Sequence, residues 1–304
     1  MHGGILHVNH IKDQIHCERA YRMGLSGKGI GVAVLDTGIF LHRDFDSRVT
    51  GFADMVNRRN FAYDDCGHGT HICGIIGGSG RMSGGRYSGI APGCNLIMVK
   101  VLDRKGNGYS SDVLAGISWV LERKEQLGIR ILNISVGACS KRGMSENSAL
   151  VKGVNRAWDA GLVVVVAAGN NGPRTMSITT PGISRKGITV GCSDDDREVL
   201  VGGNRMVDYS GRGPTAACIC KPDLVAPGCS VVSCSSRADK YTIKSGTSMS
   251  TPIVSGAVAL LLERFPDMSN KDVKLRLRES SVDIGLPRNQ QGWGLLDVGK
   301  MLER

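Results

Sequence analysis

The chain contains 304 residues, of which 41% are hydrophobic and 22% charged, a balance that excludes a disordered protein and is typical of a folded globular one. Its formal net charge is +10, but the basic residues are scattered and no nucleic-acid-binding motif accompanies them, so we expect a solvated basic surface and no nucleic-acid partner. The longest apolar run, residues 162–168, is far too short to cross a bilayer, so we expect no membrane partner.

Short apolar runs rich in β-branched residues alternate along the chain with longer segments of helical periodicity. The runs predict strands at residues 31–35, 96–101, 131–135, 162–168 and 188–192, and the periodic segments predict helices at 68–76, 111–126, 147–160, 248–265 and 270–279. Apolar strands separated by helices indicate a mostly parallel central sheet with helices on both faces, a three-layer α/β fold. No linker or repeat divides the chain, so we expect an N-terminal extension over residues 1–23 and one domain over residues 24–304.

Asp36 follows the strand predicted at residues 31–35 directly. An acid at the carboxyl end of a parallel strand points into the crevice where α/β proteins bind their ligands. The alternative is that Asp36 caps the next turn. Its position alone therefore does not distinguish a catalytic carboxylate from a capping one.

His68 lies between Gly67 and Gly69, which let the backbone pass close to another group and keep the imidazole accessible. A structural histidine is one alternative. A second is a metal pair formed by His68 and His71, but the glutamate that a zinc-hydrolase helix carries between two such histidines is missing.

Ser248 lies in a segment rich in hydroxyl side chains, residues 245–251, at the predicted start of an apolar helix. The N–H groups of a first helical turn are unpaired, and the helix dipole favours negative charge there. Helix capping explains one such hydroxyl. The segment carries more hydroxyl groups than capping needs.

In the order Asp36, His68, Ser248, the three segments resemble those of the subtilisin-like serine proteases, or subtilases, and the resemblance extends over about residues 24–296. It implies a subtilisin-like fold and a peptidase whose Ser248 attacks the scissile carbonyl to form an acyl-enzyme. His68 would take and return the proton, and Asp36 would orient the imidazole. The rival hypotheses are a catalytically inactive peptide-binding module on the same fold and a metal-dependent hydrolase.

The resemblance also implies an oxyanion hole, in which the Asn170 side chain and the backbone N–H of Ser248 stabilise the developing negative charge. It further implies two segments that hold the peptide or protein substrate, with Ala168 and Gly169 as a second wall of the primary specificity pocket. The first segment would pair with the substrate backbone and the second would oppose it; they comprise Gly106, Asn107, Gly108 and Ser135, Val136, Gly137. We expect a pocket of small and apolar groups that takes a bulky apolar side chain, with its base in residues 174–184.

No cofactor is expected to be required. Secreted relatives carry a calcium loop where this chain has residues 77–86, a stretch without a carboxylate and with two arginines, so we expect no strong calcium site there. The run Asp194–Asp196 is the other place that could attract a cation, and we interpret it as a solvated loop.

The ten cysteines show neither a disulfide scaffold nor paired zinc clusters, which favours reduced thiols. No secretory signal pattern opens the chain, so we expect a cytoplasmic enzyme of protein turnover or peptide processing, similar to the intracellular bacterial subtilisins and secreted only if a leader was removed. Cys66 lies two residues before His68, so a thiol is expected either near the imidazole or buried and inert. Residues 1–16 show no evident core role and are hypothesised to form a latch over the cleft.

Overall fold

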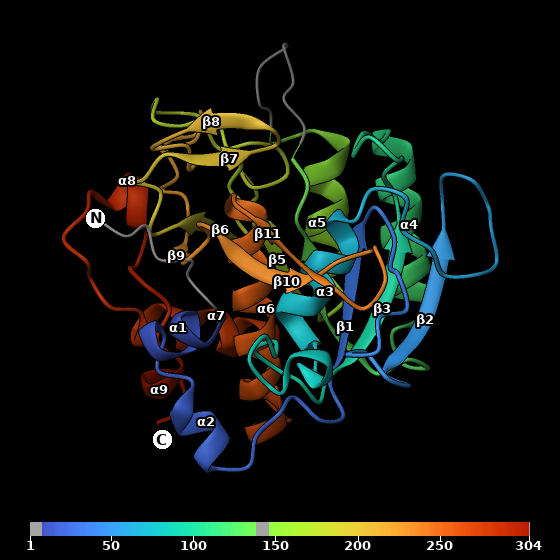
Figure 1. Cartoon of the computed structure of the whole chain (residues 1–304). Coiled ribbons are helices and arrows are strands. Elements are labelled where there is room, and N and C mark those ends of the chain that lie inside the picture. The colour runs from blue at the N-terminus through green and yellow to red at the C-terminus, as the bar shows by residue number, and fades with distance from the viewer. Residues whose placement is uncertain (1–7, 138–145, 304) are drawn as a thin grey trace.

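The computed structural model describes residues 8–137 and 146–303 (Figure 1). Its centre is a seven-stranded sheet in the order β2-β3-β1-β4-β5-β6-β9, in which every neighbouring pair is parallel. The strands are β1 Gly31–Asp36, β2 Val49–Asp54, β3 Asn95–Lys100, β4 Ile129–Ile134, β5 Val163–Ala167, β6 Ile188–Cys192 and β9 Leu224–Ala226. Every residue of β1, β5 and β6 is buried, as expected for parallel strands covered on both faces.

Four helices cover the sheet in two pairs (Figure 1): α3 His68–Gly77 with α6 Thr247–Arg264, and α4 Ser110–Arg123 with α5 Ala149–Asp159. Gly116 of α4 faces the side chain of Val99, whereas Gly69 of α3 faces that of the preceding strand residue, Met98. Successive residues of a strand point to opposite faces. The two helix pairs therefore form the outer layers of a three-layer fold.

Helix α6 is buried nearly all round, since only Ser248, Glu263 and Arg264 of its residues are not buried. A helix without a polar face belongs in the interior of a domain, and α6 packs against β4, β5 and β6. In the described part of the chain, no helix combines the length and hydrophobicity that a membrane span requires.

The predicted strands and helices are confirmed, with ends that differ by a few residues. The last of the predicted helices is α7 Asn270–Ser280. The sequence patterns missed the sheet-edge strands β2 and β9, and they missed elements too short to show a period. These are α1 Val8–Gln14, α2 Glu18–Arg22, α8 Arg288–Gln291, α9 Val298–Met301, the 3₁₀ turn Arg81–Ser83, and the hairpins β7 Val199–Val201 with β8 Asn204–Met206 and β10 Val231–Cys234 with β11 Tyr241–Lys244.

The described residues of the N-terminal segment pack into the core. Ile11 and Ile15 are fully buried, the Ile15 carbonyl accepts from the Val298 N–H at 2.8 Å, and His16 Nδ1 lies 3.0 Å from Asp297 Oδ2. The premise of the latch hypothesis, that this segment has no core role, is therefore wrong for the part that contains Ile11 and Ile15. Residues 1–7 lie outside the described ranges, and the boundary at residue 24 stays a prediction.

Candidate active site

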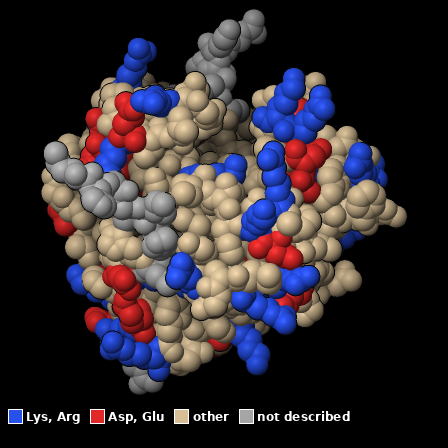
Figure 2. Space-filling model, viewed as in Figure 1, with Lys and Arg blue, Asp and Glu red and all other residues tan. Residues whose placement is uncertain are grey.

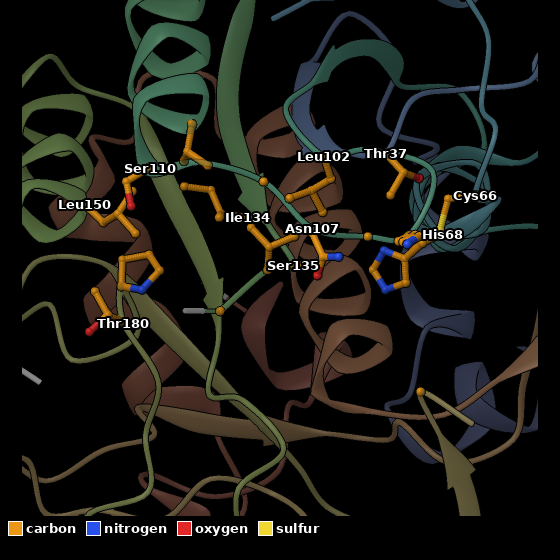
Figure 3. Close-up of a pocket in the computed structure, with 18 of the residues that line it drawn as sticks. Thr37, Cys66, His68, Leu102, Asn107, Ser110, Ile134, Ser135, Leu150 and Thr180 are labelled. Carbon is orange, nitrogen blue, oxygen red and sulfur yellow. The ribbon is translucent and has the colours of Figure 1, made fainter. Parts of the chain in front are cut away.

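A groove of about 480 Å³ opens at the carboxyl ends of the central strands (Figure 3). Thr37 follows β1, Leu102 comes two residues after β3, and Ser135 follows β4, so the groove lies where a parallel α/β sheet collects its loops. His68, the first residue of α3, stands at one end of it, and Leu150 and Thr180 stand at the other (Figure 3).

Asp36 and His68 form a direct pair. Asp36 is the last residue of β1 and is fully buried, and its two carboxylate oxygens lie 2.8 and 2.9 Å from His68 Nδ1. The Nδ1–H therefore donates to the carboxylate, which leaves Nε2 free to accept a proton. A Cβ at Gly69 would lie 2.2 Å from the Gly38 carbonyl oxygen, so only glycine allows α3 to start this close to the end of β1.

The pKa of His68 reflects opposing influences. Burial lowers it, the charge of Asp36 and its hydrogen bond raise it more, Lys244 lowers it and Asp64 raises it, so the pKa lies above the ordinary value for histidine. The imidazole is thus disposed to accept a proton, as a general base must.

Asp64 holds the start of α3 in place and was missed by the sequence analysis. Its Oδ1 accepts from the Thr37 hydroxyl at 2.9 Å and from the N–H groups of Cys66 and Gly67 at 3.1 and 2.7 Å. Its Oδ2 accepts from the N–H and hydroxyl of Thr70 at 2.9 and 2.6 Å. One carboxylate thus ties the loop before His68 to the end of β1, and no local sequence pattern predicts such contacts.

Ser248 lies in the first turn of α6, and its hydroxyl donates to the Ser135 carbonyl at 2.8 Å. Within the described residues, the Ser248 hydroxyl makes no hydrogen bond to His68. Hydrogen bonds between catalytic groups are often formed only in the substrate complex. The structure therefore joins Asp36 to His68 directly and ties the serine hydroxyl to Ser135, a residue of the groove, although Ser248 itself is not among the residues that line it.

Asn170 is anchored to the same helix start. Its Oδ1 accepts from the N–H and the hydroxyl of Thr247, both at 3.0 Å, and the Thr247 hydroxyl also accepts from the Gly169 N–H at 3.1 Å. Because the amide oxygen is engaged, the Nδ2 group remains free to donate, and a Cβ at Gly246 would lie 3.2 Å from it.

The residues predicted to hold the substrate differ in whether they line the groove. All six residues of the two predicted segments line it: Gly106, Asn107, Gly108, Ser135, Val136 and Gly137. Ala168 and Gly169 are buried and are not among the residues that line it. Their place in a wall of the primary specificity pocket therefore stays a prediction.

Thr179 explains why Ala168 and Gly169 are covered. A Cβ at Gly137 would lie 2.3 Å from Thr179 Oγ1, and one at Gly169 would lie 2.4 Å from both Oγ1 and Cγ2. The Thr179 side chain therefore stands between the two glycines, and its N–H donates to the Ala168 carbonyl at 2.8 Å. Thr179 lies within residues 174–184, where the base of the pocket was expected, but no motif marks it, so the sequence did not identify it.

Apolar side chains make up much of the groove wall. Leu150 stands at its far end beside Ser110 and Thr180 (Figure 3), and Val136 is among the lining residues. The other apolar side chains that line the groove are Leu102, Val113, Ile134 and Pro181.

His71 does not join His68 in a metal site. It is fully buried, and its Nε2 lies 3.1 and 3.2 Å from the carbonyl oxygens of Val231 and Thr242. Burial and the nearby charges of Lys244 and His68 lower its pKa to about 3, so the ring stays neutral. His71 therefore joins α3 to the β10–β11 hairpin.

Two groups of possible ligand side chains gather elsewhere in the described residues: His42 with Asp44 and Cys234, and Cys192 with Asp194 and Cys229. The Tyr241 hydroxyl donates to Asp44 Oδ2 at 2.7 Å. The Tyr209 hydroxyl lies 3.2 and 3.0 Å from the two thiols of the second group. Hydrogen bonds within the fold thus engage both groups, and neither lines the groove.

The Asp194–Asp196 run is not the solvated loop that the sequence suggests. Asp194 Oδ1 accepts from the Gly228 N–H at 2.7 Å, and buried Asp195 accepts from the Ser210 N–H at 2.7 Å. Burial raises the pKa of Asp195. Two of the three carboxylates therefore hold backbone N–H groups, and only Asp196 is exposed.

The nine cysteines in the described residues are free thiols. Cys66 is half-buried and lines the groove beside His68 (Figure 3). Burial raises the pKa of its thiol above the ordinary value. Of the two alternatives for Cys66, the structure favours the thiol near the imidazole, and its raised pKa keeps it mostly protonated at neutral pH.

Comparisons with known proteins agree on one relationship. The model of the subtilase family matches residues 27–294. Serine protease AprX of Bacillus subtilis (strain 168) is 42% identical over 285 residues, which cover 88% of this chain and 64% of AprX, so the chain spans less than two thirds of that relative. Of solved structures, Sphericase aligns with a TM-score of 0.75 at 31% identity, covering 90% of this chain and 93% of its own. A cold adapted subtilisin-like serine proteinase aligns with a TM-score of 0.73 at 29% identity, covering 90% of each chain.

Proposed function

The chain belongs to the subtilase family of serine proteases, and from this premise we propose that it is an endopeptidase that hydrolyses peptide bonds with Ser248, His68 and Asp36. The observation that carries the proposal is the geometry around His68. Its Nδ1–H is held by buried Asp36, and its Nε2 has no hydrogen-bond partner among the described residues. It lines the same groove as Ser135, whose carbonyl accepts from the Ser248 hydroxyl.

In the proposed reaction, the Ser248 hydroxyl turns from the Ser135 carbonyl towards His68 Nε2 and attacks the scissile carbonyl carbon. His68 takes the hydroxyl proton, and Asp36 stabilises the imidazolium that forms. Collapse of the tetrahedral intermediate breaks the C–N bond, and His68 gives its proton to the leaving amine. Water then adds to the acyl-enzyme with His68 as base again, which releases the acid product and restores Ser248.

The oxyanion that forms at each addition step is stabilised by the Asn170 Nδ2 group and the Ser248 backbone N–H. Two contacts support this role. The hydrogen bonds from Thr247 fix the orientation of the Asn170 amide, and the first turn of α6 leaves N–H groups without helical partners. Because these donors are in place before substrate binds, little reorganisation accompanies the reaction.

The groove supports a proposal about the acyl side of the substrate. Gly106–Gly108 would pair with its backbone as an added strand, opposite Ser135–Gly137. Thr179 fills the space between Gly137 and Gly169, so the side chain directly before the cut would be short rather than bulky. A bulky apolar side chain would fit further upstream, at the end of the groove lined by Leu150 and its apolar neighbours.

The compartment and the cofactor requirement are further parts of the proposal. We propose an intracellular protease of protein turnover or peptide processing, supported by the free thiols at nine positions, which fit a reducing environment. The proposed chemistry needs no cofactor, since the base, nucleophile and oxyanion donors are all supplied by side chains and backbone. Loss of activity with chelators and its recovery with calcium would overturn the proposal that no cofactor is needed.

The decisive experiment uses a fluorophosphonate probe, which reacts covalently with an activated serine. The wild-type chain should be labelled and should cleave a denatured protein substrate, and both activities should be lost in Ser248→Ala. An inactive peptide-binding module would bind substrate without labelling. Labelling that survives in Ser248→Ala would show that another residue is the nucleophile.

A further inference from the structure

The groove contains unpaired positive charge. Lys105 and Lys244 are among its lining residues, whereas the described residues that line it include no aspartate or glutamate. Neither ammonium group has an ion pair or hydrogen bond within residues 8–137 and 146–303. Buried Lys100 differs, because its ammonium donates to the Thr37 and Leu102 carbonyls and pairs with Asp65. Basic side chains also border the hollow in Figure 2.

Lys244 is held at a defined point of the groove. It is the last residue of β11, where its backbone pairs with Val231 of β10, and it precedes Ser248 by four residues. The side chain is half-buried. It lines the groove together with Cys66 and His68, and His71 of α3 holds its hairpin through the Val231 and Thr242 carbonyls, at 3.1 and 3.2 Å from Nε2. The charge of Lys244 also lowers the pKa of His68.

This position lies on the leaving-group side of the cleaved bond. The Gly106–Gly108 and Ser135–Gly137 segments hold the acyl part of the substrate, and the groove continues from them towards Leu150 and Thr180 (Figure 3). Cys66 and His68 stand at the opposite end, and His68 is the group that hands its proton to the leaving amine. A residue beside Cys66 and His68 therefore faces the residues that follow the cut.

We propose that Lys244 forms a subsite for an acidic side chain, aspartate or glutamate, at the first or second substrate residue after the cleaved bond; this inference rests on the proposed peptidase function. Because this ammonium has no partner in the described part of the protein, an ion pair with a substrate carboxylate would favour binding without breaking an existing ion pair. Lys105 adds a second positive charge on the acyl side, so the groove as a whole attracts acidic peptides.

The test compares quenched fluorescent peptides that are identical except for Glu, Gln or Lys at the first and second positions after the cut. Mass spectrometry of the products confirms that the cut does not move. The wild type should show a kcat/KM about three- to fivefold higher for Glu than for Gln, the range of a partly exposed ion pair, and the difference should shrink at high salt. Lys244→Met should abolish the preference, and Lys244→Glu should reverse it in favour of Lys.

The ratio between peptides separates binding from catalysis. Lys244 also acts on His68, so its removal changes kcat for every peptide, but a change common to all peptides cancels in the ratio. Lys240→Met is the matched control, because Lys240 is an exposed lysine of the same hairpin that does not line the groove. This variant should keep the wild-type preference although its net charge changes equally.

The two hypotheses fail in different ways. A wild type that takes up the fluorophosphonate probe and cleaves all peptides equally would overturn the subsite and leave the peptidase standing. A preference for Glu that persists in Lys244→Met would assign it to another residue. If the wild type cleaves no peptide and takes up no probe, the proposed peptidase fails, and the subsite fails with it. Probe uptake by the Lys244 variants shows that their active sites are assembled.

Discussion

The Asn170 amide is proposed to have two roles, as an acceptor that anchors Thr247 and as an oxyanion donor, and two substitutions should separate these roles. The amide oxygen accepts from the Thr247 N–H and hydroxyl, and the amide nitrogen is the proposed oxyanion donor. Asn170→Ala removes both ends. Asn170→Asp keeps the acceptor for Thr247 but replaces the donor with a second carboxylate oxygen.

The magnitudes follow from these contacts. In Asn170→Ala the buried Thr247 loses the acceptor for its N–H and its hydroxyl, which should lower the free energy of unfolding by about 2–4 kcal/mol. In Asn170→Asp the acceptor remains and its charge faces a helix N-terminus, so stability should change by less than about 0.5 kcal/mol. Both variants should lose about 10²–10³ in kcat, a range taken from the equivalent donor in a subtilisin, and the aspartate should lose at least as much because its charge opposes the oxyanion.

The assay measures kcat on a peptide substrate and, separately, unfolding in urea. Unfolding is followed in a Ser248→Ala background so that self-cleavage does not distort the curves. Equal destabilisation by both substitutions would refute the assigned orientation of the amide. An Asn170→Asp variant that retains most of kcat would refute the oxyanion role itself.

Three further substitutions test the electrostatics around the groove and the N-terminal helix. His68 acts as a base only when neutral, and Lys244 lowers its pKa, so Lys244→Met should move the acidic limb of the kcat/KM profile to higher pH; a movement to lower pH would contradict this reasoning. Iodoacetamide should inactivate the wild type through Cys66, and Cys66→Ser should resist. Because the thiolate is the reacting form and burial raises the pKa of that thiol, the rate should keep rising into alkaline pH; equal inactivation of Cys66→Ser would show that another group is responsible. Burial lowers the pKa of Lys12 from 10.5 to about 8. The charged ammonium therefore lowers the free energy of unfolding below pH 8, and this destabilisation disappears as the pH rises towards 10.5. The unfolding free energy of the wild type relative to Lys12→Met should therefore rise by about 3 kcal/mol between pH 7 and pH 10.5 in urea titrations, and a constant difference would show that Lys12 is not buried in its charged form.

The parts of the fold that sequence patterns predicted are those fixed by local composition. The apolar runs at β1 and β5 are buried at every residue, and a run of that kind has few other places to go. Helix α6 was equally visible, since its apolar middle fits only the interior. The two hairpins were not predicted because strands of three or four residues are too short to show a hydrophobic period.

The candidate site was predictable only where a motif surrounds the residue. Asp36 and His68 are marked by their neighbours in sequence and lie together in the structure. Thr179 is not marked, because its effect depends on two glycines, at positions 137 and 169, that meet only in the folded chain. The buried role of Ile11 was likewise hidden, since seven residues of helix show little periodicity.

Asp64 shows why the geometry of such a site depends on more than the groups that react. A serine, a histidine and an aspartate have to meet within hydrogen-bond distance although they come from different elements, and here the distance between β1 and α3 is set by a loop. Asp64 fixes that loop with five hydrogen bonds, and it also contributes to the raised pKa of His68. The same carboxylate therefore fixes the loop that positions the imidazole and adds a small contribution to its basicity, which Asp36 mainly determines. A change to this loop would alter the chemistry of His68 even if every group that touches the substrate stayed in place.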